Sequence, residues 1–116
     1  MVDFSVRTAE LDGKAFVVSL SGEADLHTAP KLKQVLDGVV EHGGKSVVVD
    51  LADVSFIDST TLGVLFGTQS QLVDQGGQLV IVASDRRVLR TLEITGVDRM
   101  LQIERTLAEG VAAVLV

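Results

Sequence analysis

The fold is decided by the stretch Val47-Val48-Val49-Asp50-Leu51-Ala52-Asp53-Val54-Ser55-Phe56-Ile57-Asp58-Ser59. It opens with an unbroken β-branched run, which is typical of a strand covered on both faces, as in a parallel sheet. A loop from Asp50 to Asp58 is expected to follow, and a helix is expected to begin near Ser59. A buried strand that leads through a loop into a helix predicts an α/β fold.

On either side of this stretch, apolar residues recur at helical spacing in further segments. The expected N-caps are Thr28, Ser84 or Asp85, and Thr106, and the expected helix stops are Gly43-Gly44, Gly76-Gly77 and Gly96. The expected inner faces consist of Leu62, Leu65, Phe66, Leu72 and Val73 of the second helix, and of Leu107, Val111, Val114 and Leu115 of the last.

The remaining segments read as strands. Residues 3–21 alternate around Asp12-Gly13, which predicts a β-hairpin that Gly22 ends. Residues 79–82 form another buried strand, and residues 100–103 a short one. The order is β-β-α-β-α-β-α-β-α. We therefore expect residues 1–116 to form a single domain with a small, mostly parallel mixed sheet, an antiparallel N-terminal hairpin and covering amphipathic helices.

Composition excludes several classes of function. The 116 residues are 47% hydrophobic and carry a net charge of −6. They include two His but no Cys, Trp or Tyr. The absence of Cys excludes thiol catalysis and Cys-type zinc sites, and acidity argues against nucleic acid or anionic membrane as a partner. We expect a soluble cytoplasmic domain without a metal or another cofactor.

Chemistry-bearing residues gather in two loops after strands, where sites form in open α/β sheets. One loop spans residues 23–28 and the other residues 56–63. Ser59 at a helix start has two compatible interpretations: its side chain caps the helix, or its hydroxyl accepts phosphate beside free amides and the positive end of the dipole. Phe56 and Ile57 have two interpretations, exposed partner contacts or a hydrophobic staple or core anchor, and we expect the second.

Two carboxylates accompany this serine. Asp58 is interpreted as closing an Asx-type turn and Asp25 as a solvated loop residue; alternatively, both frame Ser59, contact a partner and repel an added phosphate. Asp25, His27 and Ser59 are the residue types of a hydrolase triad. Because no Gly-x-Ser-x-Gly elbow surrounds Ser59 and Asp25 and His27 are only two residues apart, we expect no catalytic residues.

The sequence resembles the STAS domains of bacterial anti-sigma factor antagonists over essentially the whole chain. The resemblance is carried by the stretch from Val47 to Ser59, the loop Ser21-Gly22-Glu23-Ala24-Asp25 and the segment Gly76-Gly77-Gln78-Leu79-Val80. The resemblance implies a partner switch. The unphosphorylated antagonist binds an anti-sigma factor that is also a serine kinase, so that a sigma factor is released. Phosphorylation of the antagonist breaks the complex, and a serine phosphatase restores it.

The resemblance also implies the site residues. Ser59 corresponds to the phosphorylated serine, and the implied partner contacts are Asp25, Asp58, Ser59, Thr60, Thr61, Leu62 and Gly63. Thr61 departs from the family, which commonly has glycine there. Its side chain adds bulk where a partner would approach, and it makes Thr60 and Thr61 secondary candidates for phosphorylation.

Two further roles remain open at this point. STAS domains also serve as accessory or regulatory subunits, for instance beside transporter ATPases, where the serine need not be phosphorylated. The exposed edge strand of the hairpin is compatible with a monomer or a weak dimer.

Overall fold

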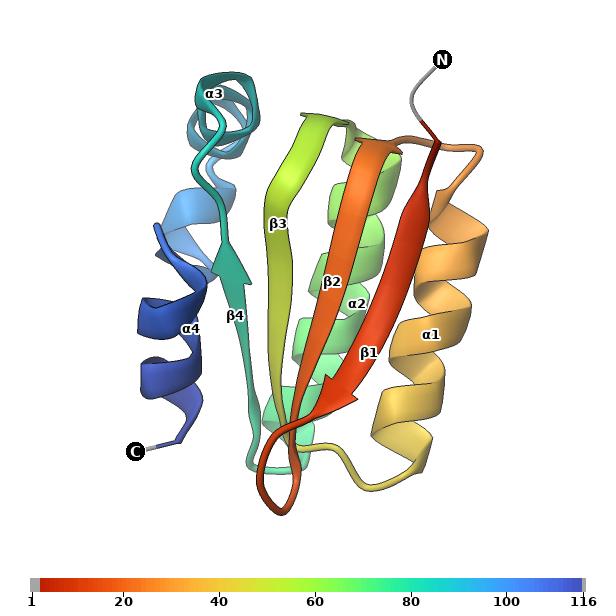
Figure 1. Cartoon of the computed structure of the whole chain (residues 1–116), viewed down its shortest axis with the longest axis vertical. Helices are drawn as coiled ribbons and strands as arrows, with labels where there is room; N and C mark the ends of the chain where they lie inside the picture. The colour runs from red at the N-terminus through yellow and green to blue at the C-terminus, as the bar shows by residue number, and fades with distance from the viewer. Residues whose placement is uncertain (1–2, 116) are drawn as a thin grey trace.

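One mixed sheet organises the computed structural model, which describes residues 3–115 (Figure 1). Within these residues the strands are β1 (Ser5–Glu10), β2 (Ala15–Ala24), β3 (Ser46–Ile57), β4 (Gln78–Val82) and β5 (Gln102–Glu104). The helices are α1 (Ala29–Glu41), α2 (Ser59–Asp74), α3 (Arg86–Ile94), the 3₁₀ turn η1 (Val97–Arg99) and α4 (Leu107–Val114). The strand order is β1-β2-β3-β4-β5, antiparallel between β1 and β2 and parallel elsewhere. The predicted fold class and element order are confirmed.

Two hydrophobic layers hold the sheet between helices. On one face, α1, α2 and α3 bury an aliphatic core against alternate residues of β2, β3 and β4, such as Val18, Val49 and Ile81. On the other face, α4 packs through Val114 against a smaller cluster that includes Val48. The central strands are buried on both faces, as their continuous valine and isoleucine content predicts.

Strands β2 and β3 run further than predicted. The segment expected as a loop continues β3 to Ile57. Strand β2 passes Gly22 and ends at Ala24, which pairs with Ile57. Irregularities between Ser19 and Ser21 and between Gly22 and Glu23 shift the register. They break the period-2 alternation that sequence analysis depends on, so the extended pairing could not be recognised. The extension carries the two loops that sequence analysis singled out to the same edge of the sheet.

Helices α1, α2 and α3 end at glycines and begin at capping residues, largely as the sequence predicts. Gly43, Gly76 and Gly96 adopt positive φ angles after α1, α2 and α3, as expected for helix stops. Asp85, rather than Ser84, caps α3 by accepting hydrogen bonds from the Arg87 and Val88 N–H groups. Among residues 3–115, no helix is long and apolar enough to cross a lipid bilayer.

Several predicted inner-face residues lie outside the core. Val73, Leu107 and Leu115 are exposed and Phe66 is half-buried, while Val114 is buried. Helix α4 has only two turns and meets the sheet through Gly110 and Val114, so the flanking leucines extend past the contact.

Candidate functional site

The site lies where β2 and β3 end. Ala24 pairs with Ile57, and the Asp58 N–H donates a hydrogen bond of 3.2 Å to the Ala24 carbonyl. The loop after β2 and the first turn of α2 therefore lie side by side at the carboxyl edge of the sheet. The two loops that were singled out from the sequence are brought together.

Asp58 caps α2. Its backbone is extended, its Oδ1 accepts the Thr61 N–H at 3.0 Å, and its carbonyl accepts the Leu62 N–H at 3.1 Å. The prediction that Asp58 closes an Asx-type turn is confirmed, whereas the interpretation of Ser59 as the cap is wrong. A carboxylate one residue earlier already satisfies the amide that a serine cap would bind.

Ser59 is consequently the first helical residue, and its side chain is exposed. Its hydroxyl makes no hydrogen bond to any residue between 3 and 115. The N–H groups of Ser59 and Thr60 have no carbonyl partner within the same part of the chain, as is usual at the start of a helix. An exposed hydroxyl thus lies beside two free donors and the positive end of the α2 dipole.

The loop after β2 is ordered by Asp25, which is half-buried. Its Oδ1 accepts N–H groups from His27 at 2.9 Å and Thr28 at 3.3 Å. Thr28 is the N-cap residue of α1 as predicted, but its hydroxyl accepts the Asp25 N–H at 2.9 Å and closes this loop instead of accepting a hydrogen bond from the helix. No hydrogen bond or ion pair joins the His27 ring to Asp25 or Ser59 within the described chain, so these residues do not form a triad.

Thr61 and Leu62 point into the core rather than toward a partner, with exposed fractions of 0% and 4%. The expectations that both contact a partner and that Thr61 is a secondary phosphate acceptor are wrong for this structure, because helical geometry turns these two positions inward. The Thr61 hydroxyl is buried without a hydrogen-bond partner in residues 3–115. Its bulk does not obstruct the outer surface of α2, where Thr60 and Gly63 are exposed.

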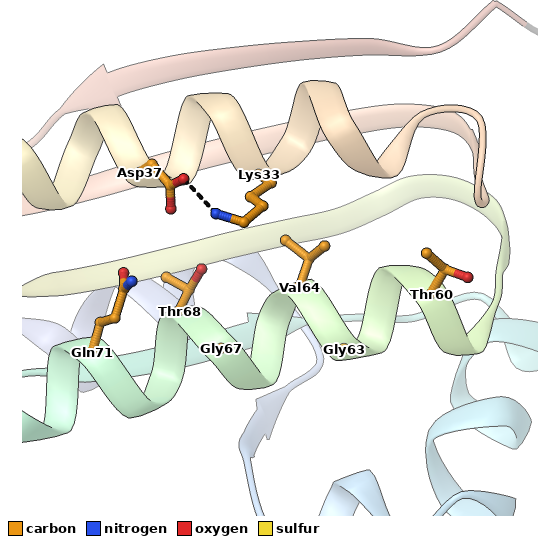
Figure 2. A pocket seen from close by; sticks show the side chains of 8 residues that line it. All are labelled: Lys33, Asp37, Thr60, Gly63, Val64, Gly67, Thr68 and Gln71. Atoms are coloured by element: carbon orange, nitrogen blue, oxygen red, sulfur yellow. Dashed lines mark hydrogen bonds and ion pairs between the residues drawn. The ribbon is translucent and has the colours of Figure 1, made fainter.

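A shallow groove runs from this first turn along α1 and α2 (Figure 2). Thr60, Gly63 and Gly67 lie on its α2 side, and Lys33 and Asp37 of α1 form an ion pair of 2.7 Å across from them. A Cβ atom at Gly63 or Gly67 would meet nothing within 4 Å. The surface beside Ser59 therefore exposes bare helix backbone that another polypeptide could approach closely.

The opposite flank of the site carries an exposed aromatic ring. Ile57 is buried, but Phe56 is 48% exposed, so the expected core anchor is wrong for Phe56. Adjacent residues of an extended strand face opposite sides, and only one of the two can enter the core. Phe56 lines a hollow of about 260 Å³ together with Arg87 and Thr91 of α3. Sequence reasoning missed Arg87, whose only signal was the Arg86-Arg87 pair following a helix cap.

The acidic side chains of the site accept hydrogen bonds from backbone N–H groups. The described residues include no group of three or more His, Cys, Asp or Glu side chains that could hold a metal ion. The carboxylates of Asp25 and Asp58 are engaged by the backbone of their own loops. The arrangement offers an exposed hydroxyl at the start of α2, beside backbone N–H groups without a carbonyl partner in residues 3–115.

Comparison with known proteins identifies close relatives. The anti-sigma-B factor antagonist of Listeria monocytogenes is 32% identical over 108 residues, which cover 93% of this chain and 95% of that protein. The anti-sigma-B factor antagonist of Staphylococcus aureus is 32% identical over 102 residues, covering 88% and 94%. These names describe a regulatory role rather than a catalytic one.

Solved structures share the fold over nearly the whole chain. An anti-sigma factor antagonist from Mycobacterium paratuberculosis superposes with a TM-score of 0.89 at 32% identity, covering 98% of this chain and 96% of the other. SpoIIAA in its unphosphorylated form, at 16% identity, has the same fold with a TM-score of 0.73, covering 94% and 96%. The STAS domain model matches residues 6–110. The chain therefore belongs to the STAS domain family.

Proposed function

We propose that this chain is an anti-sigma factor antagonist controlled by phosphorylation of Ser59. Its unphosphorylated form binds an anti-sigma factor that is also a serine kinase, and a sigma factor is thereby released. A serine phosphatase reverses the modification. The observation that carries the proposal is the exposed, unbonded hydroxyl of Ser59 on a surface that includes Thr60, Gly63 and Phe56.

The free protein is well suited to carry a phosphate at this position. The modification adds about −1.5 to −2 charges at neutral pH. The unpartnered N–H groups of Ser59 and Thr60 and the α2 dipole stabilise negative charge there. The Asp58 cap, whose carboxylate already holds the Thr61 N–H, does not need to rearrange.

The complex with the kinase, in contrast, is not suited to carry a phosphate on Ser59. A neutral hydroxyl can be packed closely against a partner, but a dianion buried without a cation carries a large desolvation penalty. A penalty of only about 3 kcal/mol changes an affinity by more than a hundredfold. We propose that Asp25 and Asp58 add to this effect, since they contact the partner and repel the phosphate.

The fold of a relative supports a switch without refolding. SpoIIAA in its phosphorylated form shares the fold of this chain with a TM-score of 0.74, close to the value for its unphosphorylated form. At 17% identity this likeness concerns the fold alone. We propose that the present chain likewise keeps its fold when Ser59 is modified.

The proposal is tested by incubating the protein with each candidate anti-sigma factor kinase from its source and ATP, followed by mass spectrometry. We expect one phosphate, on Ser59. Ser59→Ala should abolish the modification and retain kinase binding, whereas Ser59→Asp should weaken binding, and Thr60→Ala should behave as wild type. Phosphate on another residue, or unchanged binding by Ser59→Asp, would overturn the proposal. Binding without any phosphorylation would favour the accessory-subunit role.

A further inference from the structure

Positive charge is concentrated on one helix of an otherwise acidic chain. Residues 1–83 contain five basic and eleven acidic residues, whereas residues 84–116 contain five of each. Arg86, Arg87 and Arg90 lie within five consecutive positions at the start of α3, and all three are exposed. We call these three residues the α3 arginine surface.

Only one of the three arginines is engaged. Arg87 lies 3.2 Å from Asp85, and this hydrogen-bonded pairing lowers the pKa of the Asp85 carboxyl. Arg86 and Arg90 form no ion pair with any residue from 3 to 115. Two guanidinium groups are therefore available to an external anion.

Arg87 connects this surface with the exposed Phe56 ring. It lines the hollow of about 260 Å³ that Phe56 borders, and also a second hollow of about 440 Å³ that Arg86, Arg90 and Ile94 border. Phe56 and Ile94 are 48% and 70% exposed. Large apolar side chains thus flank the guanidinium groups, which is the composition of a protein contact surface.

The surface adjoins the phosphorylation site. Phe56 lies at the end of β3, three residues before Ser59. Figure 1 shows α3 at the same end of the sheet as the carboxyl ends of β2 and β3. A partner that covers Ser59 needs to extend only across the end of β3 to reach Arg87.

We propose that the α3 arginine surface and Phe56 form a second contact site for the protein partner. The site takes an acidic segment that presents a large apolar side chain to the Phe56 hollow and carboxylates to Arg86 and Arg90. This inference rests on the proposed function, whose partner is the kinase that phosphorylates Ser59. Glu23 lines the first hollow and Glu93 the second, so a partner carboxylate is attracted to the arginines and repelled by these two side chains.

Charge complementarity favours this occupant. The net charge of −6 repels an acidic segment over most of the protein, and α3 offers the attractive region at the same end as Ser59. Such a contact steers association and fixes the orientation of the partner. The positive charge of these arginines is the same whether or not Ser59 carries phosphate.

The test compares two double charge reversals. Arg86→Glu with Arg90→Glu changes the α3 arginine surface. Lys14→Glu with Lys45→Glu makes the same change in net charge at the amino ends of β2 and β3, where both lysines are exposed. Calorimetry and stopped-flow association measure the binding of wild type and both variants to the purified kinase at low and physiological salt, and thermal unfolding verifies folding. Phe56→Ala is compared with Leu115→Ala, another exposed apolar side chain.

We expect the arginine variant to raise Kd by about tenfold or more, chiefly through slower association, and to flatten the dependence of affinity on salt. The change in log Kd caused by the lysine variant should be less than half of the change in log Kd caused by the arginine variant. Phe56→Ala should weaken binding, and Leu115→Ala should not.

Two results overturn the inference alone. In the first, wild type binds the kinase and is phosphorylated on Ser59, but the arginine and lysine variants bind equally well. In the second, the arginine variant loses only affinity for a DNA duplex or anionic vesicles, which would assign the surface to another anion. If wild type itself neither binds nor is phosphorylated, the proposed function fails and the inference fails with it.

Discussion

Asp58 and Ser59 occupy separate positions at the start of α2: Asp58 is the N-cap, and Ser59 is the first helical residue. Asp58 closes the first turn of α2, and Ser59 is thereby left with a hydroxyl that the fold does not use. A serine that capped the helix would have its oxygen held by a backbone amide, where phosphorylation would compete with the cap. Under the proposed function, the Asp-Ser order separates the stability of the helix from its regulation.

Thr61 is the residue whose role the sequence could not reveal. Its side chain was expected at the partner surface, but it is fully buried and its hydroxyl has no hydrogen-bond partner in the described structure. Leaving a buried hydroxyl unpaired costs about 1–3 kcal/mol. We predict that Thr61→Val raises the free energy of unfolding by about 1 kcal/mol, because the apolar branch occupies nearly the same volume without a polar atom.

Urea unfolding of Thr61→Val, compared with Thr60→Val at the neighbouring exposed position, measures this effect. The Thr60 variant should leave the free energy of unfolding within about 0.5 kcal/mol of wild type. A loss of stability in Thr61→Val would show that the hydroxyl has a native hydrogen-bond partner, and would contradict our account of this position.

Spacing predicted which segment the site residues occupy, but not which way each side chain points. Successive residues of a helix are rotated by about 100°, so neighbouring positions of the same turn point in different directions. Thr61 and Leu62 lie on the face of α2 that packs on the core, while Thr60 and Gly63 lie on its exposed face.

At the scale of elements, α4 depends on one glycine to approach the sheet. A Cβ atom at Gly110 would lie 2.5 Å from Val82 Cγ2 and 3.1 Å from Val48 Cγ1. We predict that Gly110→Val lowers the free energy of unfolding by about 1–3 kcal/mol, because the added side chain forces α4 away from the sheet. Denaturant unfolding and amide exchange in residues 107–114 measure the change.

Gly38→Ala provides the matched control. A Cβ atom at Gly38 would meet nothing within 4 Å, and the residue lies inside α1. This substitution should raise the free energy of unfolding by about 0.5–1 kcal/mol through helix propensity. Equal effects of the two substitutions would show that α4 does not pack closely on the sheet.

The start of α3 has a pH dependence that the structure specifies. The side-chain hydrogen bond from Arg87 is the main cause that lowers the pKa of Asp85, assisted by the Arg87 and Val88 N–H groups. A carboxyl with a lowered folded-state pKa stabilises the fold above its unfolded pKa, and loses that contribution as pH falls through the folded value. We predict that Asp85→Asn, which keeps a capping oxygen but loses the charge, is less stable than wild type at pH 7.

The difference between wild type and Asp85→Asn should shrink as the pH falls below the ordinary range for aspartate. Thermal unfolding of both proteins from pH 7 to pH 2.5 measures it, and the other carboxylates cancel in the comparison. A difference that persists undiminished at pH 2.5 would mean that the charge of Asp85 does not stabilise α3.

At the scale of the whole molecule, the sequence predicted the order of the elements because aliphatic runs, glycine stops and caps mark them locally. It did not predict how far β2 and β3 extend, since their irregular register depends on pairing between distant segments such as Ala24 and Ile57. That pairing places the loop after β2 beside Ser59. Sequence therefore singled out the two loops of the candidate site, and the structure of the sheet was needed to show that they lie side by side.

The rigidity of this sheet leads to a prediction for the modified protein. The central strands are buried on both faces, and Ser59 lies outside that core. We predict that phosphorylation shifts backbone amide NMR signals only in residues 23–28 and 56–64, and leaves those of β4 and α4 unchanged. Shifts throughout α2 and the sheet would indicate a rearrangement of the fold instead of a local change of charge.

The most direct test of a charge switch at Ser59 is to compare the affinities of two forms of the same chain for the kinase. Stoichiometrically Ser59-phosphorylated protein and unmodified protein are titrated against the purified kinase by calorimetry at physiological salt. We predict that phosphorylation raises Kd by about a hundredfold or more. Equal Kd values for the two forms would contradict the account.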